Sequence, residues 1–392
     1  MIQQLRRIAI SILVVSSVVV AETAPINQAV VNAIDEHYLY TSRPQWKQAR
    51  KALLGIDPAP VESTYAVITR ELAKLRDSEL HLLSPSELAS LNDESKGTRV
   101  GTGLIDFGID VVPATGEARV VTALVGSPAA TAGIRPGDVI AAVNGKSTRS
   151  LDHEQVLDAL RSRTAADLSI RRKKSIIRVR LSPSDAPLHA VVAELKATKA
   201  GKIGYIRIAQ FTPAVSGELR STVEQFEKEH PAGYIVDLRN NPGGFLDAAE
   251  NTAGLFISGS LGAKLRRNGD AEPISSPATL LTKAPLIVLV NEGTASAAEF
   301  VAGALQARQR AKLVGVSTYG RGQTQLYVAL SGGYGLVVPS ALLRTPAGST
   351  FKGAGLHPDI LVRSGPLSEP ELARERDMQF QRAVSILAVK AG

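Results

Sequence analysis

A serine at the start of an expected helix is the first candidate for chemistry in this sequence. The apolar run LIVLVNEG (286–293) predicts a buried strand that ends in a tight turn, and TASAAEFVAGALQ (294–306) predicts a helix after it. Ser296 falls in the first turn of that helix, where free N–H groups and the positive end of the helix dipole favour an alkoxide or an oxyanion. Taken alone, the segment favours the simpler alternative, in which Thr294 and Ser296 only cap the helix.

A second candidate is the turn in YIVDLRNNPGGFLDAA (234–249), where an expected strand runs into Asn-Pro-Gly-Gly and then a helix. Two glycines after a proline can direct backbone N–H groups towards one point, as an oxyanion hole requires. Without further context, such a sequence is more typical of an ordinary turn.

The third candidate is STYGRGQTQ (317–325), in which Arg321 lies between two glycines. A Gly-X-Gly sequence lets the backbone turn sharply and brings X close to whatever lies opposite. Arginine keeps its proton throughout the physiological pH range. The segment therefore predicts a permanent cation at the rim of a site.

The composition excludes several classes of function. The chain has 392 residues, of which 44% are hydrophobic and 21% charged, as in a globular protein of two or three domains. It has no cysteine, which excludes disulfides, thiol catalysis and thiolate metal sites. Its six histidines are scattered without metal-ligand spacing, so we expect neither a metal nor a cofactor.

The N-terminus predicts a secretory signal peptide over residues 1–21, with a basic start, an apolar run and a small-residue cleavage site. The alternative is a retained membrane anchor. Cleavage would remove Arg6 and Arg7 and lower the formal charge from +8 to +6.

The basic segment IRRKKSIIRVR (170–180) predicts an exposed hairpin, and its alternative is a surface for anionic lipid or nucleic acid. Because we expect secretion, we expect no nucleic-acid partner.

Hydrophobic periodicity divides the rest of the chain into regions of different character. Residues 24–95 predict helices, the last of them starting at SPSEL with Ser84 or Ser86 as its cap. Short Val/Ile-rich runs with glycines predict a small half-open barrel, and strands alternating with helices then predict a layered α/β unit that ends in an amphipathic helix. We predict a signal peptide (1–21), a helical N-terminal region (22–98), a barrel module (99–183) and an α/β core with a C-terminal helix (184–392).

The segment GSPAATAGIRPGDVIAAVNGK (126–146) predicts a short helix that stops at Gly133, a tight turn, a buried strand and an Asn-Gly hairpin turn. It resembles the PDZ domains of periplasmic proteases; the alternative is a barrel that binds no ligand. The resemblance implies that an extended peptide adds as a strand beside one loop, whose N–H groups hold the peptide's terminal carboxylate. That loop is GTGLI, made of Gly101, Thr102, Gly103, Leu104 and Ile105.

The order of these motifs, closed by GAGLHPDI (353–360), resembles that of the carboxyl-terminal processing, or tail-specific, proteases. Members of this family are secreted or periplasmic serine endopeptidases with a Ser–Lys dyad, and the resemblance covers nearly the whole mature chain. It implies a multidomain α+β and α/β fold: a helical N-terminal region, a PDZ-like β-barrel module, a layered, crotonase-like α/β protease core and a C-terminal helix.

The resemblance also assigns roles to residues. Its nucleophile matches Ser296, and its general base, a lysine 25 residues further on, falls on Arg321. The glutamine four residues after that lysine, which positions it, matches Gln325. The backbone donors of the oxyanion hole correspond to Ala297 together with Gly243 or Gly244.

Arg321 is therefore a departure at the base itself. A desolvated lysine can have a pKa of about 7–8 and act as a base, whereas an arginine with a pKa above about 12.5 is almost never neutral near pH 7. Lys352 and His357 are the nearest downstream substitutes, although their spacing does not favour them. A smaller departure is LRDSELHLL (75–83), which matches the corresponding Asp-x-His/Ser stretch of the family only loosely.

Three hypotheses follow from these residues. The first is a periplasmic serine endopeptidase that captures C-terminal tails and cleaves with Ser296. The second is a pseudoprotease that binds tails or an active partner without cutting. A purely structural envelope protein is the third, and it leaves Ser296, Gln325 and the Asn-Pro-Gly-Gly turn unexplained. The expected ligands are C-terminal tails of proteins or peptides, while a regulatory envelope protein and a homo-oligomer remain open.

Overall fold

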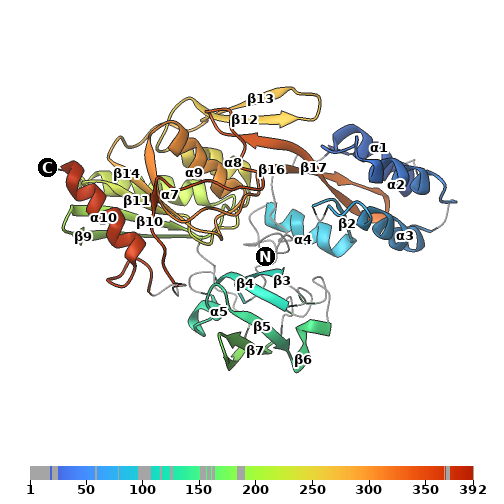
Figure 1. Cartoon of the computed structure of the whole chain (residues 1–392), viewed down its shortest axis with the longest axis horizontal. Helices are drawn as coiled ribbons and strands as arrows, with labels where there is room; N and C mark the ends of the chain where they lie inside the picture. Colours follow the sequence, from blue (N-terminus) through green and yellow to red (C-terminus); the bar gives the residue numbers. More distant parts are fainter. Residues whose placement is uncertain are drawn as a thin grey trace.

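The computed structural model describes residues 18–19, 25–57, 60–77, 79–95, 107–114, 117–123, 127–150, 156, 160, 164–182, 190–365, 367 and 371–391. The described chain is mixed α/β, as predicted, and contains three six-stranded sheets (Figure 1). The predicted peptide-binding loop at 101–105, most of the helix expected within 152–163, and all of the expected signal peptide except Val18–Val19 lie outside the described residues.

The central sheet has the strand order β18-β15-β14-β11-β10-β9. Its strands are parallel except β9, which is antiparallel to β10 at one edge. Apolar runs such as LIVLV are fully buried because helices cover both faces of such a sheet. The strands are β9 (Val191–Thr198), β10 (Gly201–Ile208), β11 (Tyr234–Asp237), β14 (Leu286–Val290), β15 (Ala311–Gly315) and β18 (Ile360–Leu361).

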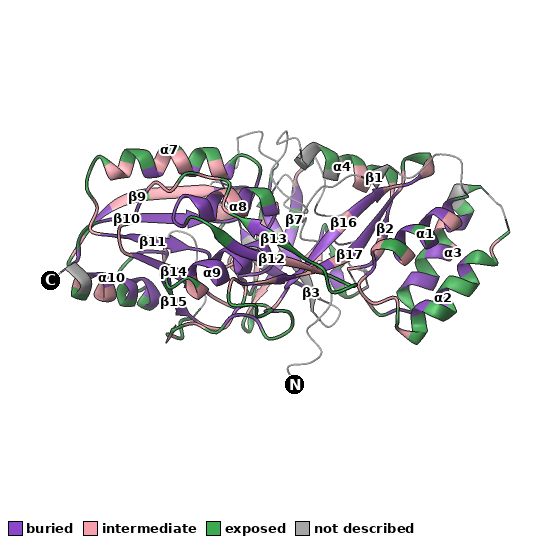
Figure 2. Ribbon diagram, turned by 90° about the horizontal axis from the view of Figure 1, so that it is seen from above, coloured by how far each residue is buried: buried purple, intermediate pink, exposed green. Residues whose placement is uncertain are grey.

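Helices cover the two faces of this sheet in separate layers. Figure 2 shows α7 and α10 on opposite sides of it. The larger core combines one face with α7 (Val215–Glu227), α8 (Leu246–Gly254) and α9 (Ala297–Ala307). The other face packs against α10 (Met378–Ala391) through residues such as Phe380 and Leu387. This arrangement confirms the predicted layered α/β core.

A second sheet joins the N-terminal region to the rest of the chain. Its strands run β1-β16-β17-β12-β13, and β2 pairs with β17. Side chains of the first three helices pack on Val328, Leu330, Leu336 and Val338 of this sheet, so helices and strands share one core. The strands are β1 (Val18–Val19), β2 (His81–Leu83), β12 (Ser260–Arg266), β13 (Ala271–Ser275), β16 (Gln323–Ala329) and β17 (Gly335–Arg344).

The N-terminal region is helical, as predicted, apart from one strand. Its helices are α1 (Ile26–His37), α2 (Pro44–Leu54), α3 (Val61–Ala73) and α4 (Pro85–Ser95). Ser84 caps α4, since its hydroxyl accepts from the Glu87 N–H and the Glu87 carboxylate accepts from the Ser84 N–H. The expectation of helices alone was wrong at β2, because a three-residue strand is too short to show its periodicity and exists through pairing with β17.

The third sheet forms the barrel module, with a core of its own. Ser127 caps the short helix α5 (Pro128–Thr131), and Asn144 and Gly145 adopt φ values of 49° and 78° in the hairpin turn between β5 and β6. These features confirm the local predictions, including the hairpin of β7 and β8. The strands are β3 (Ile109–Ala114), β4 (Glu117–Ala123), β5 (Val139–Val143), β6 (Lys146–Ser147), β7 (Ala166–Arg172) and β8 (Ser175–Leu181).

The C-terminal helix begins later than its sequence suggests. The amphipathic segment EPELARERDMQFQRAVSILAVK (369–390) predicts a helix over its length, but α10 begins at Met378. Asp377 explains the difference, because its carboxylate accepts hydrogen bonds from the N–H groups of Ala373 and Phe380 and closes a turn in front of the helix. No helix in the described part of the chain combines the length and apolar character needed to cross a membrane.

Candidate active site

Ser296 lies at a strained turn between β14 and α9. Its φ of 57° and ψ of −121° are unusual for a residue with a side chain, and such backbone strain clusters at functional sites. Its Oγ is completely buried and makes no hydrogen bond to any described residue. In this structure the hydroxyl therefore makes no hydrogen bond that caps α9. Thr294 does have a structural role, since its hydroxyl accepts from the Asn291 N–H and donates to the Leu238 carbonyl.

Glu299 connects the serine turn to the segment that carries Arg321. Its buried carboxylate accepts from the Ser296 N–H at 2.9 Å, from the Gly320 N–H at 2.7 Å and from the Arg321 N–H at 2.8 Å. The Thr318 hydroxyl is a fourth donor. Burial raises the pKa of this carboxyl group, while the four hydrogen bonds oppose that shift.

Sequence reasoning did not assign a role to Glu299. The signal was available, because a serine followed three residues later by glutamate is the spacing of a capping box. In the structure, the glutamate half of that arrangement is used and the serine hydroxyl stays free.

The Pro-Gly-Gly turn lies directly against Ser296. A Cβ atom added to Gly243 would come within 2.8 Å of the Ser296 Cβ and 3.0 Å of the Ala297 nitrogen, and one added to Gly244 would come within 2.1 Å of the Phe211 oxygen. Both glycines also have positive φ, at 106° and 132°. Glycine is thus required at both positions by space and by backbone conformation.

The backbone donors near Ser296 differ in availability. The Gly243 N–H donates to the Asn241 side chain at 2.9 Å. Within the described chain, neither the Gly244 N–H nor the Ala297 N–H, at the first position of α9, donates to an acceptor. These two groups, rather than the Gly243 N–H, are the ones that could stabilise an oxyanion.

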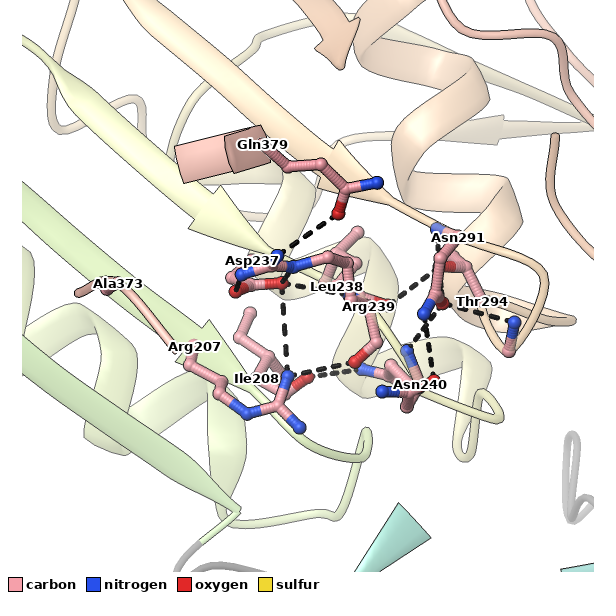
Figure 3. Close-up of polar contacts among 12 residues, drawn as sticks. Arg207, Ile208, Asp237, Leu238, Arg239, Asn240, Asn291, Thr294, Ala373 and Gln379 are labelled. Carbon is pink, nitrogen blue, oxygen red and sulfur yellow. Dashed lines mark hydrogen bonds and ion pairs between the residues drawn. The ribbon is translucent and has the colours of Figure 1, made fainter. Parts of the chain in front are cut away.

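Three asparagines hold the Pro-Gly-Gly turn against the serine turn. Asn241 accepts from the Ala295 N–H with its carbonyl and donates to the Ile208 carbonyl with its side chain. Asn240 and Asn291 exchange hydrogen bonds of 2.8 and 2.9 Å (Figure 3). The turns that follow β11 and β14 are therefore held in one fixed arrangement.

A buried ionic network lies next to these turns, around Arg239 at the end of β11. Arg239 donates to Asp237 at 2.9 Å and to both carboxylate oxygens of Asp377, at 2.8 and 2.7 Å. Arg207 donates to the Arg239 carbonyl (Figure 3). Tyr205 donates to Asp237. Burial opposes ionisation of Asp237, but Arg239 and Arg207 outweigh it and hold the pKa of this carboxyl below its ordinary value.

The structure directs the Arg321 side chain to partners other than Ser296. Only 6% of the side chain is exposed, and its Nε lies 3.6 Å from Oε1 of Glu79. Its guanidinium carbon is 5.3 Å from the centre of the Tyr319 ring, within cation–π range. Gln325 is buried in the following strand and accepts from the Tyr327 hydroxyl at 3.4 Å.

The two substitute bases considered from the sequence also have other partners. Lys352 is exposed and donates to the Gln323 side chain and to the Tyr40 hydroxyl. His357 is exposed as well, with its Nδ1 3.1 Å from the Ser317 hydroxyl. Neither bonds to Ser296 Oγ. No cluster of His, Cys, Asp and Glu among the described residues could hold a metal ion.

Comparison with protein-family models gives two matches that coincide with these structural units. Residues 202–362, which contain the serine turn, the Pro-Gly-Gly turn and Arg321, match peptidase family S41. Residues 119–172, which contain most of the third sheet, match the PDZ domain.

Similar proteins cover most of the chain. It is 35% identical over 332 residues to a carboxyl-terminal-processing protease of Synechocystis sp., covering 83% of this chain and 77% of the relative. A protein of the same description from Picosynechococcus sp. is 33% identical over 347 residues, covering 87% and 83%. The solved structure of a photosystem II D1 C-terminal processing protease superposes with a TM-score of 0.72 at 27% identity, covering 92% of this chain and 96% of that one.

Proposed function

Since this chain belongs to the carboxyl-terminal processing serine proteases of peptidase family S41, and carries their PDZ domain, we propose that it cleaves proteins near their C-terminal tails with Ser296 as the nucleophile. The observation that carries the proposal is the serine turn. Ser296 has a free, buried hydroxyl at the start of α9, beside the unused N–H groups of Ala297 and Gly244.

The chemistry proceeds from this arrangement. Ser296 Oγ attacks the carbonyl carbon of the scissile peptide bond, and the two N–H groups donate to the oxygen that becomes negative. Glu299 holds Ser296 in position through the backbone. The C–N bond then breaks, the amine leaves with a proton, and a water molecule hydrolyses the resulting ester to release the acid and regenerate the Ser296 hydroxyl. Arg321 cannot accept the serine proton near neutral pH, so water has to take it, and we expect slow turnover.

We further propose that the tail is recognised by the PDZ module and that the protein acts in the periplasm. Addition of an extended peptide beside a strand is the usual PDZ binding mode. The apolar run of residues 1–21, ending in small residues, supports export, and a chain without cysteine is compatible with an oxidising compartment.

A second candidate is a pseudoprotease that binds tails without cutting them. The observation that favours it is the ion pair between Arg321 and Glu79, which occupies the base position with a permanently charged group. In that case the PDZ module and the surroundings of Ser296 would serve a binding or regulatory role.

One set of variants separates the two candidates. Mature protein (22–392) would be incubated with a peptide ending in small apolar residues, as wild type, Ser296→Ala and Arg321→Lys. We expect slow cleavage by the wild type, none by Ser296→Ala, and at least tenfold faster cleavage by Arg321→Lys, since a general base contributes about 10²–10⁴-fold.

The other outcomes are equally informative. Cleavage by Arg321→Lys alone would establish the pseudoprotease for the natural sequence. If no folded variant cleaves, the assignment of the site to this peptide class is wrong. Labelling with a fluorophosphonate, which reacts with an activated serine, gives a faster first measurement: wild type should be labelled and Ser296→Ala should not.

A further inference from the structure

One β-hairpin of the PDZ module is strongly basic and takes no part in the proposed chemistry. Strands β7 and β8 form it, with Lys173 and Lys174 in the turn between them. The module, residues 99–183, has 13 basic and 8 acidic residues, a formal charge of +5. Six of the basic residues lie in 171–180, which contains no acid. The positive charge of the module is therefore concentrated in this hairpin.

The pleat of β8 places part of this charge on an exposed face. Ile177 and Val179 pack against the core of the module. Because side chains alternate along a strand, Ile176 and Arg178 point to the opposite face, where both are exposed. Figure 1 shows β7, the partner of β8, at the end of the module farther from the central sheet. This face is thus open to an external partner.

The cations of the hairpin differ in how far they are neutralised. Two of them form ion pairs, Arg172 with Asp138 and Arg180 with Asp167. Lys173, Lys174 and Arg178 are exposed and form no ion pair with any described residue. These three charges are available to an anionic partner.

The turn itself indicates a role beyond folding. Lys173 has a φ of 55°, a conformation that hairpin turns usually give to Gly, Asn or Asp. The turn between β5 and β6 follows this rule with Asn144 and Gly145. Lysines also protect the edge strands of sheets from aggregation, but Lys173 and Lys174 lie in the turn, beyond the paired residues. Neither turn chemistry nor edge protection explains two lysines there.

We propose that this hairpin binds a membrane surface that contains anionic phospholipids. Lys173, Lys174 and Arg178 would contact the phosphate groups, as basic clusters do at anionic membranes. Ile176, which is 55% exposed beside these cations, is suited to the boundary between headgroups and acyl chains. The strands β8 and β3 are opposite edges of the sheet, so this contact leaves the β3 edge open to a peptide.

The composition of the hairpin favours lipid over nucleic acid. Proteins that bind single-stranded nucleic acid combine a basic groove with aromatic side chains on which bases stack. Residues 164–182 contain no aromatic side chain. The exposed apolar residue of the hairpin is aliphatic, which fits an acyl-chain environment better than a base.

Sedimentation with phospholipid vesicles tests the proposal independently of proteolysis. Mature protein (22–392) is used because the apolar residues 8–20 would themselves bind lipid. One set of vesicles contains phosphatidylcholine alone, and the other contains equal parts of phosphatidylcholine and phosphatidylglycerol. We expect binding to the anionic vesicles only, and weaker binding as salt is added, because salt screens exposed charges. Equal binding to both sets, or binding to neither, would overturn the proposal.

Variants of the hairpin locate the contact. Lys173→Gln/Lys174→Gln/Arg178→Gln should bind anionic vesicles about 100-fold more weakly, since each basic residue near such a surface contributes about fivefold. Ile176→Ser should weaken binding about three- to tenfold through the lost apolar contact. Unchanged binding of the triple variant would refute the site, and unchanged binding of Ile176→Ser would refute insertion of its side chain.

A matched control separates the hairpin from net charge. Lys47→Gln/Lys51→Gln/Lys283→Gln removes the same charge from exposed positions outside the PDZ module and should bind like the wild type. Equal weakening in this control would show that net charge alone is responsible and would refute the site. Thermal unfolding checks that all variants are folded, as expected for exposed substitutions.

Two soluble polyanions distinguish lipid from other partners. A single-stranded oligonucleotide and polyglutamate are tested against the wild type and the triple variant at the same salt concentration. We expect both to bind more weakly than the anionic vesicles. Tighter binding of either one, lost in the triple variant, would assign the hairpin to nucleic acid or to an acidic protein and overturn the choice of lipid.

Discussion

At the scale of single residues, the backbone arrangement around Ser296 and the chemistry of the site depend on different atoms. One buried carboxylate, that of Glu299, accepts from the backbone N–H groups of both Ser296 and Arg321. The Arg321 side chain, by contrast, forms an ion pair with Glu79. All residues except proline have a backbone N–H group. Arg321→Lys should therefore change the chemistry and keep the hydrogen bonds between Glu299 and the backbone.

Glu250 gives a residue-scale prediction about pH. Burial raises the pKa of this α8 carboxyl to about 7, helped by the neighbouring acids Asp247 and Glu272 and opposed by Lys264. A carboxyl whose pKa is raised on folding binds its proton more tightly in the folded state. Its favourable contribution is complete below the ordinary pKa of about 4.5 and is lost as the pH rises through about 7.

Glu250→Gln should therefore be more stable than the wild type at pH 8 by about 1–2 kcal/mol, a value reduced for solvent screening, and equally stable at pH 4. Thermal unfolding at the two pH values measures the difference, which corresponds to a few degrees in Tm. Glu218→Gln, an exposed change on α7, is the control and should show no such pH dependence. A Glu250→Gln effect of equal size at both pH values would contradict the explanation.

At the scale of elements, α10 is anchored to the catalytic scaffold by charge as well as by packing. Its apolar side chains cover one face of the central sheet, while Asp377, just before its first residue, is completely buried and binds Arg239 through both oxygens. Arg239 follows β11 and precedes the asparagines that clamp the two turns of the site. The position of a C-terminal helix is thereby coupled to the geometry around Ser296.

We expect Asp377→Ala to destabilise the protein by about 3–5 kcal/mol, because the buried network then holds two arginines, Arg207 and Arg239, against the single carboxylate of Asp237. It should also increase hydrogen exchange in α10 and weaken fluorophosphonate labelling of Ser296. Denaturant unfolding and exchange measurements provide the test. Gln381→Ala, an exposed change in the same helix, should cost less than about 0.5 kcal/mol. A similar, small cost for both variants would show that packing alone holds the helix.

At the scale of the whole molecule, the PDZ module and the N-terminal helices depend on the core to different degrees. The described buried residues of the PDZ module form a cluster of their own, between Phe107 and Leu181. One link to the rest is the ion pair of Arg135 and Glu371, 3.6 Å long and with side chains 37% and 33% exposed, which contributes little. The N-terminal helices instead complete a core together with β16 and β17.

Replacing residues 99–183 by a short flexible linker should therefore leave a folded protein whose Ser296 still reacts with fluorophosphonate. Deleting residues 25–57 should remove the cover from Val328 and Val338 and abolish cooperative unfolding, because that apolar surface then faces water. Calorimetry and labelling of both variants test the contrast. The interpretation fails if loss of the PDZ module unfolds the core, or if loss of α1 and α2 is tolerated.

The sequence by itself determined the parts of this protein that depend on neighbouring residues. Strand, turn and helix follow one another around Ser296 and around Gly243 and Gly244 because hydrophobic period, caps and glycines act over a few positions. The spacing between Ser296 and Arg321 is likewise a property of the sequence.

The tertiary structure alone decided which distant side chains meet. It brought Glu79 to Arg321 and Asp377 to Arg239, and it selected the Gly244 N–H by giving that of Gly243 another acceptor. It also made a strand of His81–Leu83 by pairing it with β17. The pairs Glu79–Arg321, Asp377–Arg239 and β2–β17 join residues far apart in the chain, and the choice between Gly243 and Gly244 depends on a single hydrogen bond. A local sequence pattern carries no information about how the layers pack.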